Sequence, residues 1–253
     1  MSPLYALLFL TAVSAQSIVW QDEFDTLDTT KWNYDLGNGV NGWGNAELEY
    51  YTDSTSNVYV DNGNLVIEAI REDSNGFSFT SGKLTTLGKY DFLYGTIVAR
   101  IKIPSITAGL WPAFWMLGST SDTWPEQGEI DIMEYGAQAA LAAGTGNTEL
   151  FGTFHWESNG AEADYGLTYT SPTDMSADYH IYNVTWTESL ITMYVDGIQY
   201  QAMDISAIPT FQKNFYFIIN LAVGGNFPAI TDPNGITAPL PAQLLVDYIR
   251  VYQ

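Results

Sequence analysis

Apolar and polar residues alternate with a period of two from residue 17 onward, and this feature constrains the fold more than any other. The alternation places every second side chain on the same face of an extended strand. In the run 95–103, a set made of Thr96, Val98, Arg100 and Lys102 alternates with a set made of Ile97, Ala99, Ile101 and Ile103. One solvent-exposed face and one face packed on the core are therefore expected for this strand.

Short turns break the alternation at places that favour β-hairpins. Asn62-Gly63 and Asp196-Gly197 each separate two apolar-rich runs, and both dipeptides are typical of tight two-residue turns. Further strands are expected at 152–156, 179–186, 214–223 and 245–252, for a total of roughly eleven to fifteen. Only the Ala-rich stretch 138–144 indicates a turn of helix or a loop insertion.

No linker, internal repeat or charge block divides the chain. All-β sandwiches of this length commonly form one unit, so residues 16–253 are expected to be a single domain. The fold class that these patterns predict is all-β, with two antiparallel sheets forming a sandwich of the jelly-roll type.

Composition narrows the choice of partners. With 29 acidic and 8 basic residues the net charge is -21, which disfavours nucleic acid, anionic membrane surfaces and sulfated or uronic polysaccharides. Aromatic residues make up 15% of the chain, more than an ordinary core needs, so some rings are expected to be exposed for binding. Cysteine is absent, which excludes disulfides. No uncovered apolar stripe stands out, and a monomer is expected.

The first residues are typical of a secretion signal. MSPLYALLFLTAVSA contains a short apolar run followed by Val13-Ser14-Ala15, a small-residue cleavage pattern. The sequence therefore predicts a signal peptide at 1–15 and a secreted, extracellular protein. The alternative is a buried N-terminal strand. No other segment has the roughly 18 apolar residues of a membrane span.

Three acids lie close together in the segment 128–135. Glu129 and Asp131 share a face of a strand by alternation, whereas Glu134 follows Glu129 at an odd offset and would point the other way. One extra residue near Ile132-Met133, a β-bulge, would bring Glu134 back to the same face. The spacing therefore predicts a bulged strand with three carboxylates on one surface.

Two long carboxylates that lean together over a third suit the chemistry of a retaining glycosidase, in which the carboxyl groups stand about 5–5.5 Å apart. Glu129 is the expected nucleophile and Glu134 the acid/base. The charges of Asp131 and of the nucleophile favour the protonated form of Glu134, although spacing alone does not decide which glutamate takes which role. A calcium or structural carboxylate cluster and a solvated strand face remain alternatives.

The same acids sit within a longer ordered set of segments. The set comprises Trp43-Gly44-Asn45 with Glu47, Tyr50 and Tyr51; Ser81-Gly82; Tyr94-Gly95 to Lys102; Gly109 to Gly118; the signature Glu129-Ile-Asp131-Ile-Met-Glu134; Phe154-His155; 179–186; Asn220 to Pro228; and Val246 to Tyr252. This set resembles glycoside hydrolase family 16, and the extra residue in the signature resembles its laminarinase-like, bulged branch. The resemblance covers nearly the whole chain from Trp20.

The resemblance implies a β-jelly-roll with a substrate cleft across its concave face, and catalysis without a cofactor. It places Glu129 at the nucleophile, Asp131 at an assisting carboxylate and Glu134 at the acid/base. It places these residues near bound sugar: Trp111, Trp115, Trp124, Asn45, Arg71 and His155. For each a structural role is the alternative, most of all for Trp115, which could be a core residue.

Many relatives carry a structural Ca²⁺, and Glu23, the backbone of Gly63 and Asp247 fall at its ligand positions. Asp247 on an exposed strand edge and Glu23 in a turn are the alternative there.

Three functions stay open on these grounds. The bulged signature favours an endo-β-1,3-glucanase that could also cut mixed-linkage glucan, since the related lichenases and plant transglycosylases resemble a shorter Glu-x-Asp-x-Glu form. A β-glucan transglycosylase needs the same two glutamates. A recognition module without catalysis is disfavoured because all three acids are present. Galactan hydrolysis is disfavoured too, because clusters of basic residues that would bind sulfate are missing. Val98, Glu126 and Ala229 depart from the family pattern, which leaves the substrate specificity open. Asn183-Val184-Thr185 matches the acceptor pattern for N-glycosylation.

Overall fold

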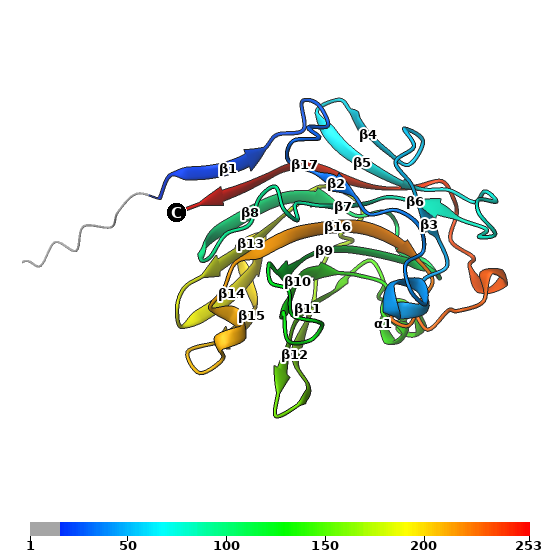
Figure 1. The fold of residues 1–253 in the computed structure, drawn as a ribbon. Coiled ribbons are helices and arrows are strands. Elements are labelled where there is room, and N and C mark those ends of the chain that lie inside the picture. Colours follow the sequence, from blue (N-terminus) through cyan, green and yellow to red (C-terminus); the bar gives the residue numbers. More distant parts are fainter. Residues whose placement is uncertain (1–15) are drawn as a thin grey trace, which may run out of the picture.

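A computed structural model describes residues 16–253 as two large antiparallel β-sheets packed face to face (Figure 1). The predicted all-β sandwich is confirmed. The predicted secretion signal, residues 1–15, lies outside the described residues. In the part of the chain that the structure describes, every helix falls short of the length and hydrophobicity needed to span a bilayer.

The first sheet has eight strands in the order β15-β14-β13-β8-β17-β5-β4, with β1 paired to β17. Its strands are β1 (Ile18–Asp22), β4 (Val58–Asp61), β5 (Asn64–Ala69), β8 (Gly95–Lys102), β13 (His180–Trp186), β14 (Leu190–Val195), β15 (Ile198–Asp204) and β17 (Ala242–Tyr252). Because β17 pairs with β8, β5 and β1, the last strand of the chain holds the middle of this sheet together.

The second sheet has seven strands in the order β12-β11-β10-β9-β16-β7-β2. Its strands are β2 (Asn33–Tyr34), β7 (Lys83–Thr85), β9 (Leu110–Gly118), β10 (Glu129–Glu134), β11 (Glu149–Ser158), β12 (Ala161–Thr170) and β16 (Phe215–Val223). The remaining elements are β3 (Tyr50–Tyr51) and β6 (Thr80–Ser81), which pair in parallel, an irregular turn at Gly42–Ala46, α1 (Gln138–Ala143), and 3₁₀ turns at Pro209–Phe211 and Pro233–Gly235.

Local sequence explains the hairpins. Asn62 and Gly63 have φ values of 50° and 73°, and Asp196 and Gly197 have 49° and 79°, the left-handed conformations that a two-residue hairpin turn requires. The turns join β4 to β5 and β14 to β15, so both predicted hairpins are confirmed. The predicted turn of helix at 138–144 is α1.

The core fills the space between the two sheets. Phe217 on β16 is fully buried and contacts the rings of Trp20, Tyr90, Phe92 and Phe114, whose centroids lie 5.3–6.5 Å away. The alternate residues of β8, from Ile97 to Ile101, are buried as the alternation predicted. The core therefore packs against the inner face of the second sheet, and the outer face of this sheet is available for a functional site.

The strand count differs from the expectation. The described residues contain seventeen strands, more than the range predicted from sequence. Three of them, β2, β3 and β6, have two residues each, too few to show any period. The long strand β12 was also missed. As the outermost strand of its sheet it is exposed along most of its length, so it lacks the alternation of polar and apolar residues that a strand packed on one face shows.

Candidate active site

The bulge in β10 decides where the three acids point. Asp131 pairs with Trp115 of β9, and Met133 pairs with the next residue back, Phe114, so Ile132 is an extra residue. Ile132 and Met133 are both fully buried in the core. Asp131 and Glu134 consequently emerge on the same outer face of the sheet, as the odd spacing predicted. We refer to this face as the cleft face.

Each outer glutamate is held by an indole. Trp124 Nε1–H donates to Glu129 Oε2 at 2.9 Å, and Trp111 Nε1–H donates to Glu134 Oε1 at 2.9 Å. Trp111 is itself fixed by stacking on Phe227, with ring centroids 5.0 Å apart. The two bonds orient both carboxyl groups while leaving one oxygen of each available for other partners.

Burial governs the charge of the three acids. It is the main cause that raises the pKa of Glu129, with the charge of Asp131 adding to it. Burial and the charge of Glu134 raise the pKa of Asp131 in the same way. Burial raises the pKa of Glu134 to about 7, while the bond from Trp111 acts in the opposite direction. The cluster therefore retains a proton near neutral pH, as a general acid requires.

His155 joins the three acids from the neighbouring strand. It pairs with Glu129 in the β10–β11 ladder, and its Nε2 lies 3.3 Å from Asp131 Oδ2. Its other ring nitrogen, Nδ1, lies 3.0 Å from Glu162 Oε1 on β12. The imidazole thus stands between the buried acid and an exposed one, next to the ring of Trp124 at 6.0 Å.

Trp115 belongs to a polar network on the cleft face. Its Nε1–H donates to Asn220 Oδ1 at 2.8 Å, and Asn220 Nδ2 donates to the hydroxyl of Tyr51 at 3.1 Å. Tyr51 in turn donates to Glu47 Oε2 at 2.9 Å, and Asn45 Nδ2 lies 3.4 Å from the other oxygen of Glu47. The indole of Trp115 is therefore half-buried on this face and lies outside the fully buried core.

Lys83 is a site residue that sequence reasoning missed. Its ammonium lies 4.0 Å from the ring centroid of Trp43 and 5.3 Å from that of Trp115, and only 7% of the side chain is exposed. Burial lowers the pKa of Lys83, although nearby carboxylates, Glu47 first, favour its charge. A single lysine in the uncharged run 79–86 of a chain with only 8 basic residues was the signal available.

Arg71 is not brought to the acids. Its Nη2 donates to the carbonyl of Ile236 at 2.8 Å, and its guanidinium lies 4.6 Å from the ring of Phe79. These contacts tie the end of β5 to the loop before β17. Within residues 16–253 Arg71 has no hydrogen bond to Glu129, Asp131 or Glu134.

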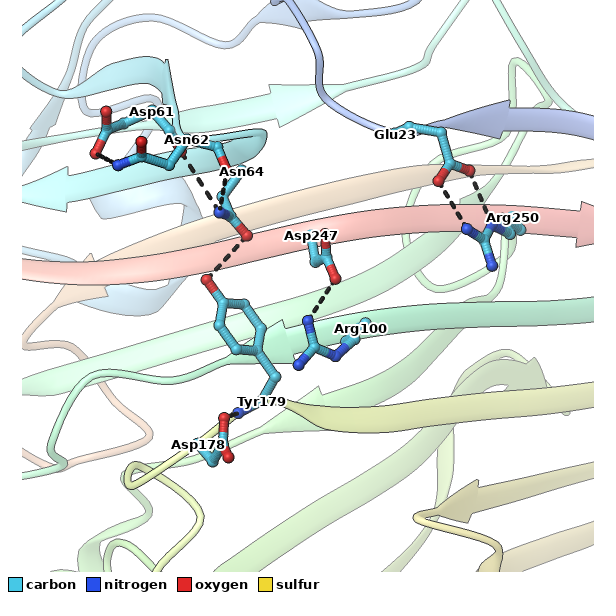
Figure 2. A network of polar contacts seen from close by, with 9 residues as sticks. All are labelled: Glu23, Asp61, Asn62, Asn64, Arg100, Asp178, Tyr179, Asp247 and Arg250. Atoms are coloured by element: carbon cyan, nitrogen blue, oxygen red, sulfur yellow. Dashed lines mark hydrogen bonds and ion pairs between the residues drawn. The ribbon is translucent and has the colours of Figure 1, made fainter.

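The residues expected to hold calcium belong to the first sheet and its connections. Figure 2 shows two of them, Glu23 and Asp247, each bonded to a different arginine and not converging on one point. Both oxygens of Glu23 accept from Arg250, at 2.8 and 2.7 Å, and Asp247 Oδ2 accepts from Arg100 at 2.5 Å. Gly63 lies in the turn between β4 and β5. The donors are the hard oxygens that Ca²⁺ prefers, but in this arrangement each carboxylate already has a cationic partner.

Comparison with known proteins adds a family to this geometry. The profile of the glycosyl hydrolases of family 16 matches residues 45–219. The chain is 40% identical to a glucan endo-1,3-beta-glucosidase A1 of Niallia circulans over 96% of its length, but it spans only 38% of that relative. It is 37% identical to a beta-glucanase of Rhodothermus marinus, covering 93% of the chain and 85% of the relative. The crystal structure of the laminarinase catalytic domain from Thermotoga maritima superimposes with a TM-score of 0.82 and 38% identity, covering 95% of this chain and 99% of that one.

Proposed function

The chain belongs to the glycosyl hydrolases of family 16, and from this membership and the site we propose that it hydrolyses internal β-1,3-glucosidic bonds of laminarin-type glucans with retention of configuration. The observation that carries the proposal is the bulged strand, which presents Glu129, Asp131 and Glu134 on one face. The Niallia relative is named a glucan endo-1,3-beta-glucosidase and the Thermotoga relative a laminarinase, which supports this choice of substrate.

In the proposed first step, Glu129 attacks the anomeric carbon while Glu134 gives its proton to the departing glycosidic oxygen. The bond between that oxygen and the anomeric carbon breaks, and a covalent glycosyl-enzyme forms. In the second step Glu134, now ionised, takes a proton from water, and the resulting hydroxide displaces Glu129. Glu134 is protonated again at the end, so the cycle consumes one water and needs no cofactor.

The surroundings of the two glutamates support these roles. The N–H of Trp124 and the nearby His155 both favour the charged form of Glu129, which must be ionised to attack. Glu134 has a pKa of about 7, which suits a group that gives and takes a proton near neutral pH. Asp131 lies between them in β10 and assists through its charge.

Aromatic and polar side chains around the acids are proposed to bind the glucan. Trp124 is 46% exposed and lines a hollow of about 160 Å³ beside the nucleophile, where its ring can stack on a glucose face. Trp111 and Trp115 offer further ring surface, and Asn45 and His155 offer hydrogen bonds to hydroxyls. Arg71 is bonded to the loop at Ile236, so it would reach sugar only where the bound glucan extends to that loop.

The charge of the hollow favours a neutral polysaccharide. Glu126, Glu157 and Glu162 line it together with Trp124, and the net charge of the chain is -21. Carboxylates at this density repel sulfate and uronate groups. We therefore propose a neutral β-glucan as the substrate, with β-1,3 linkages preferred and mixed-linkage glucan as the nearest competitor.

The test is to incubate the protein with laminarin, barley mixed-linkage glucan, cellulose and agarose, and to measure new reducing ends and product sizes. Glu129→Gln should be inert, whereas Glu188→Gln, a change in the exposed turn between β13 and β14, should keep full activity. New ends from laminarin support the proposal. Products that are redistributed without new ends would indicate a transglycosylase, and binding without products a recognition protein.

We propose further that the protein acts outside the cell as a monomeric single domain. The apolar, charge-free start of the chain supports export. Mass spectrometry of the exported protein should find an N-terminus at Gln16, and light scattering should give the mass of one chain. A retained leader or a dimer mass would contradict this proposal.

Structural calcium is a separate proposal. The ion would bind Glu23, the carbonyl of Gly63 and Asp247, and the two carboxylates would have to exchange an arginine for the ion. A ligand that binds only the folded state stabilises it by mass action. Added Ca²⁺ should therefore raise the melting temperature of the wild type but not of Asp247→Asn, and an equal effect on both would refute this site.

A further inference from the structure

Three donor atoms of different kinds meet at the centre of the cleft face. One atom each from Glu129, Asp131 and His155 lie within 4.8 Å of one another. Asp131 is only 3% exposed, and its Oδ2 has no hydrogen-bond partner. A buried carboxylate oxygen without a hydrogen bond is costly and is expected to find a proton or a cation. The acceptor is thus aimed at a position that a positive ligand would fill.

The imidazole faces that oxygen with a second acceptor. When Nδ1 of His155 donates to Glu162 Oε1, 3.0 Å away, the neutral ring offers the lone pair of Nε2 to a metal ion. Nε2 lies 3.3 Å from Asp131 Oδ2. In a tetrahedral zinc site with bonds of about 2.0–2.1 Å, two neighbouring ligand atoms stand about 3.3–3.4 Å apart. The separation of these two acceptors matches that edge.

The surroundings complete the pattern of a metal site. A metal-bound histidine commonly donates its other ring N–H to a carboxylate, and Glu162 occupies this place. Glu129 can supply a third donor, because Trp124 engages only its Oε2. His155 is 22% exposed, so a hydrated ion can reach the group from solvent. Two carboxylates and one neutral imidazole bring a bound dication close to electrical neutrality.

We propose that Glu129, Asp131 and His155 form an inhibitory binding site for a divalent transition metal of the zinc type, with a fourth position left to water. The mixed nitrogen and oxygen donors and the low coordination number favour Zn²⁺ over Ca²⁺ or Mg²⁺, which take six or more oxygen ligands. A metal on Glu129 occupies the oxygen that would attack the sugar, so metal and substrate exclude each other. That inhibition rests on the proposed function, whereas the binding itself does not.

The chain offers a matched control for the test, because it has 2 histidines. The second, His180, lies on the other sheet and bonds Asp196 Oδ2 at 2.6 Å. Protein without a histidine tag is titrated with ZnCl₂ by calorimetry. Wild type and His180→Gln should bind one ion at the same affinity, and His155→Gln should bind it at least roughly tenfold more weakly. Equal affinity in all three proteins would overturn the proposal.

A second measurement needs no change at the site. In the NMR spectrum of the two imidazole rings, Zn²⁺ should shift the signals of one ring only, and His180→Gln identifies that ring as His155. Shifts confined to His180, or none at all, would overturn the site even if His155→Gln failed to fold. Both measurements proceed without substrate, so the metal site can fail while hydrolysis stands, and the reverse. If hydrolysis is present, Zn²⁺ should inhibit it competitively in the wild type and His180→Gln.

Discussion

Replacing Trp111 by Phe tests the electrostatics of the proposed acid. The substitution removes the N–H that bonds Glu134 Oε1 at 2.9 Å but keeps an aromatic ring against Phe227. That bond stabilises the charged form of Glu134, so its loss should raise the pKa of the carboxyl. A hydrogen bond to a charged group contributes about 1.5–3 kcal/mol. At about 1.4 kcal/mol per pKa unit, the lower value corresponds to a rise of about one unit.

The assay is the pH profile of kcat/KM on an unsubstituted laminari-oligosaccharide. Because Glu134 must be protonated to act as the acid, activity falls as pH rises through its pKa, which is about 7 in the wild type. The alkaline limb of Trp111→Phe should therefore move upward by about one pH unit. Trp115→Phe is the matched control, because the N–H of Trp115 donates to Asn220 and not to a carboxyl group. The alkaline limb of this variant should lie at the same pH as in the wild type. A limb that stays or moves downward in Trp111→Phe would refute the reasoning.

Three further predictions concern Glu134, Glu49 and Phe217. Glu134→Gln should lower kcat/KM by about 10²–10⁴-fold on oligosaccharides and much less on a nitrophenyl glycoside, whose leaving group needs no proton; equal losses in kcat/KM would argue against the acid role. Burial raises the pKa of Glu49 well above its usual value, so its contribution to stability is present below about pH 4.5 and is lost as pH rises. Glu49→Gln should therefore gain melting temperature relative to wild type as pH increases, and a constant difference would contradict this. Phe217→Ala should lower the free energy of unfolding by about 3–5 kcal/mol in a urea titration, and a loss under about 1 kcal/mol would show that its ring cluster repacks.

Much of the fold was readable from sequence because its signals are local. Asn62-Gly63 and Asp196-Gly197 mark hairpins through conformations that few other residues adopt, and β8 shows its buried face by alternation alone. The bulge in β10 was readable as well. Three acids at an odd spacing are consistent with one common face only if a residue is inserted.

The rest depends on strand pairing, which no local pattern encodes. His155 meets Asp131 because β10 and β11 pair with Glu129 opposite His155, and a shift of one residue would turn the imidazole away. Lys83 reaches the cleft from a three-residue strand that cannot show a period. The arginine partners of Glu23 and Asp247 likewise follow from the pairing of β17 with β1 and β8.

The bulge also determines how β10 responds to a change in chain length. In a regular strand, losing one residue turns every later side chain to the opposite face. In β10, however, Ile132 and Met133 together fill one inward step between Asp131 and Glu134. Deleting either residue restores simple alternation and leaves both acids facing outward. A single-codon deletion can thus convert the longer signature into the shorter Glu-x-Asp-x-Glu form without turning either acid to the opposite face.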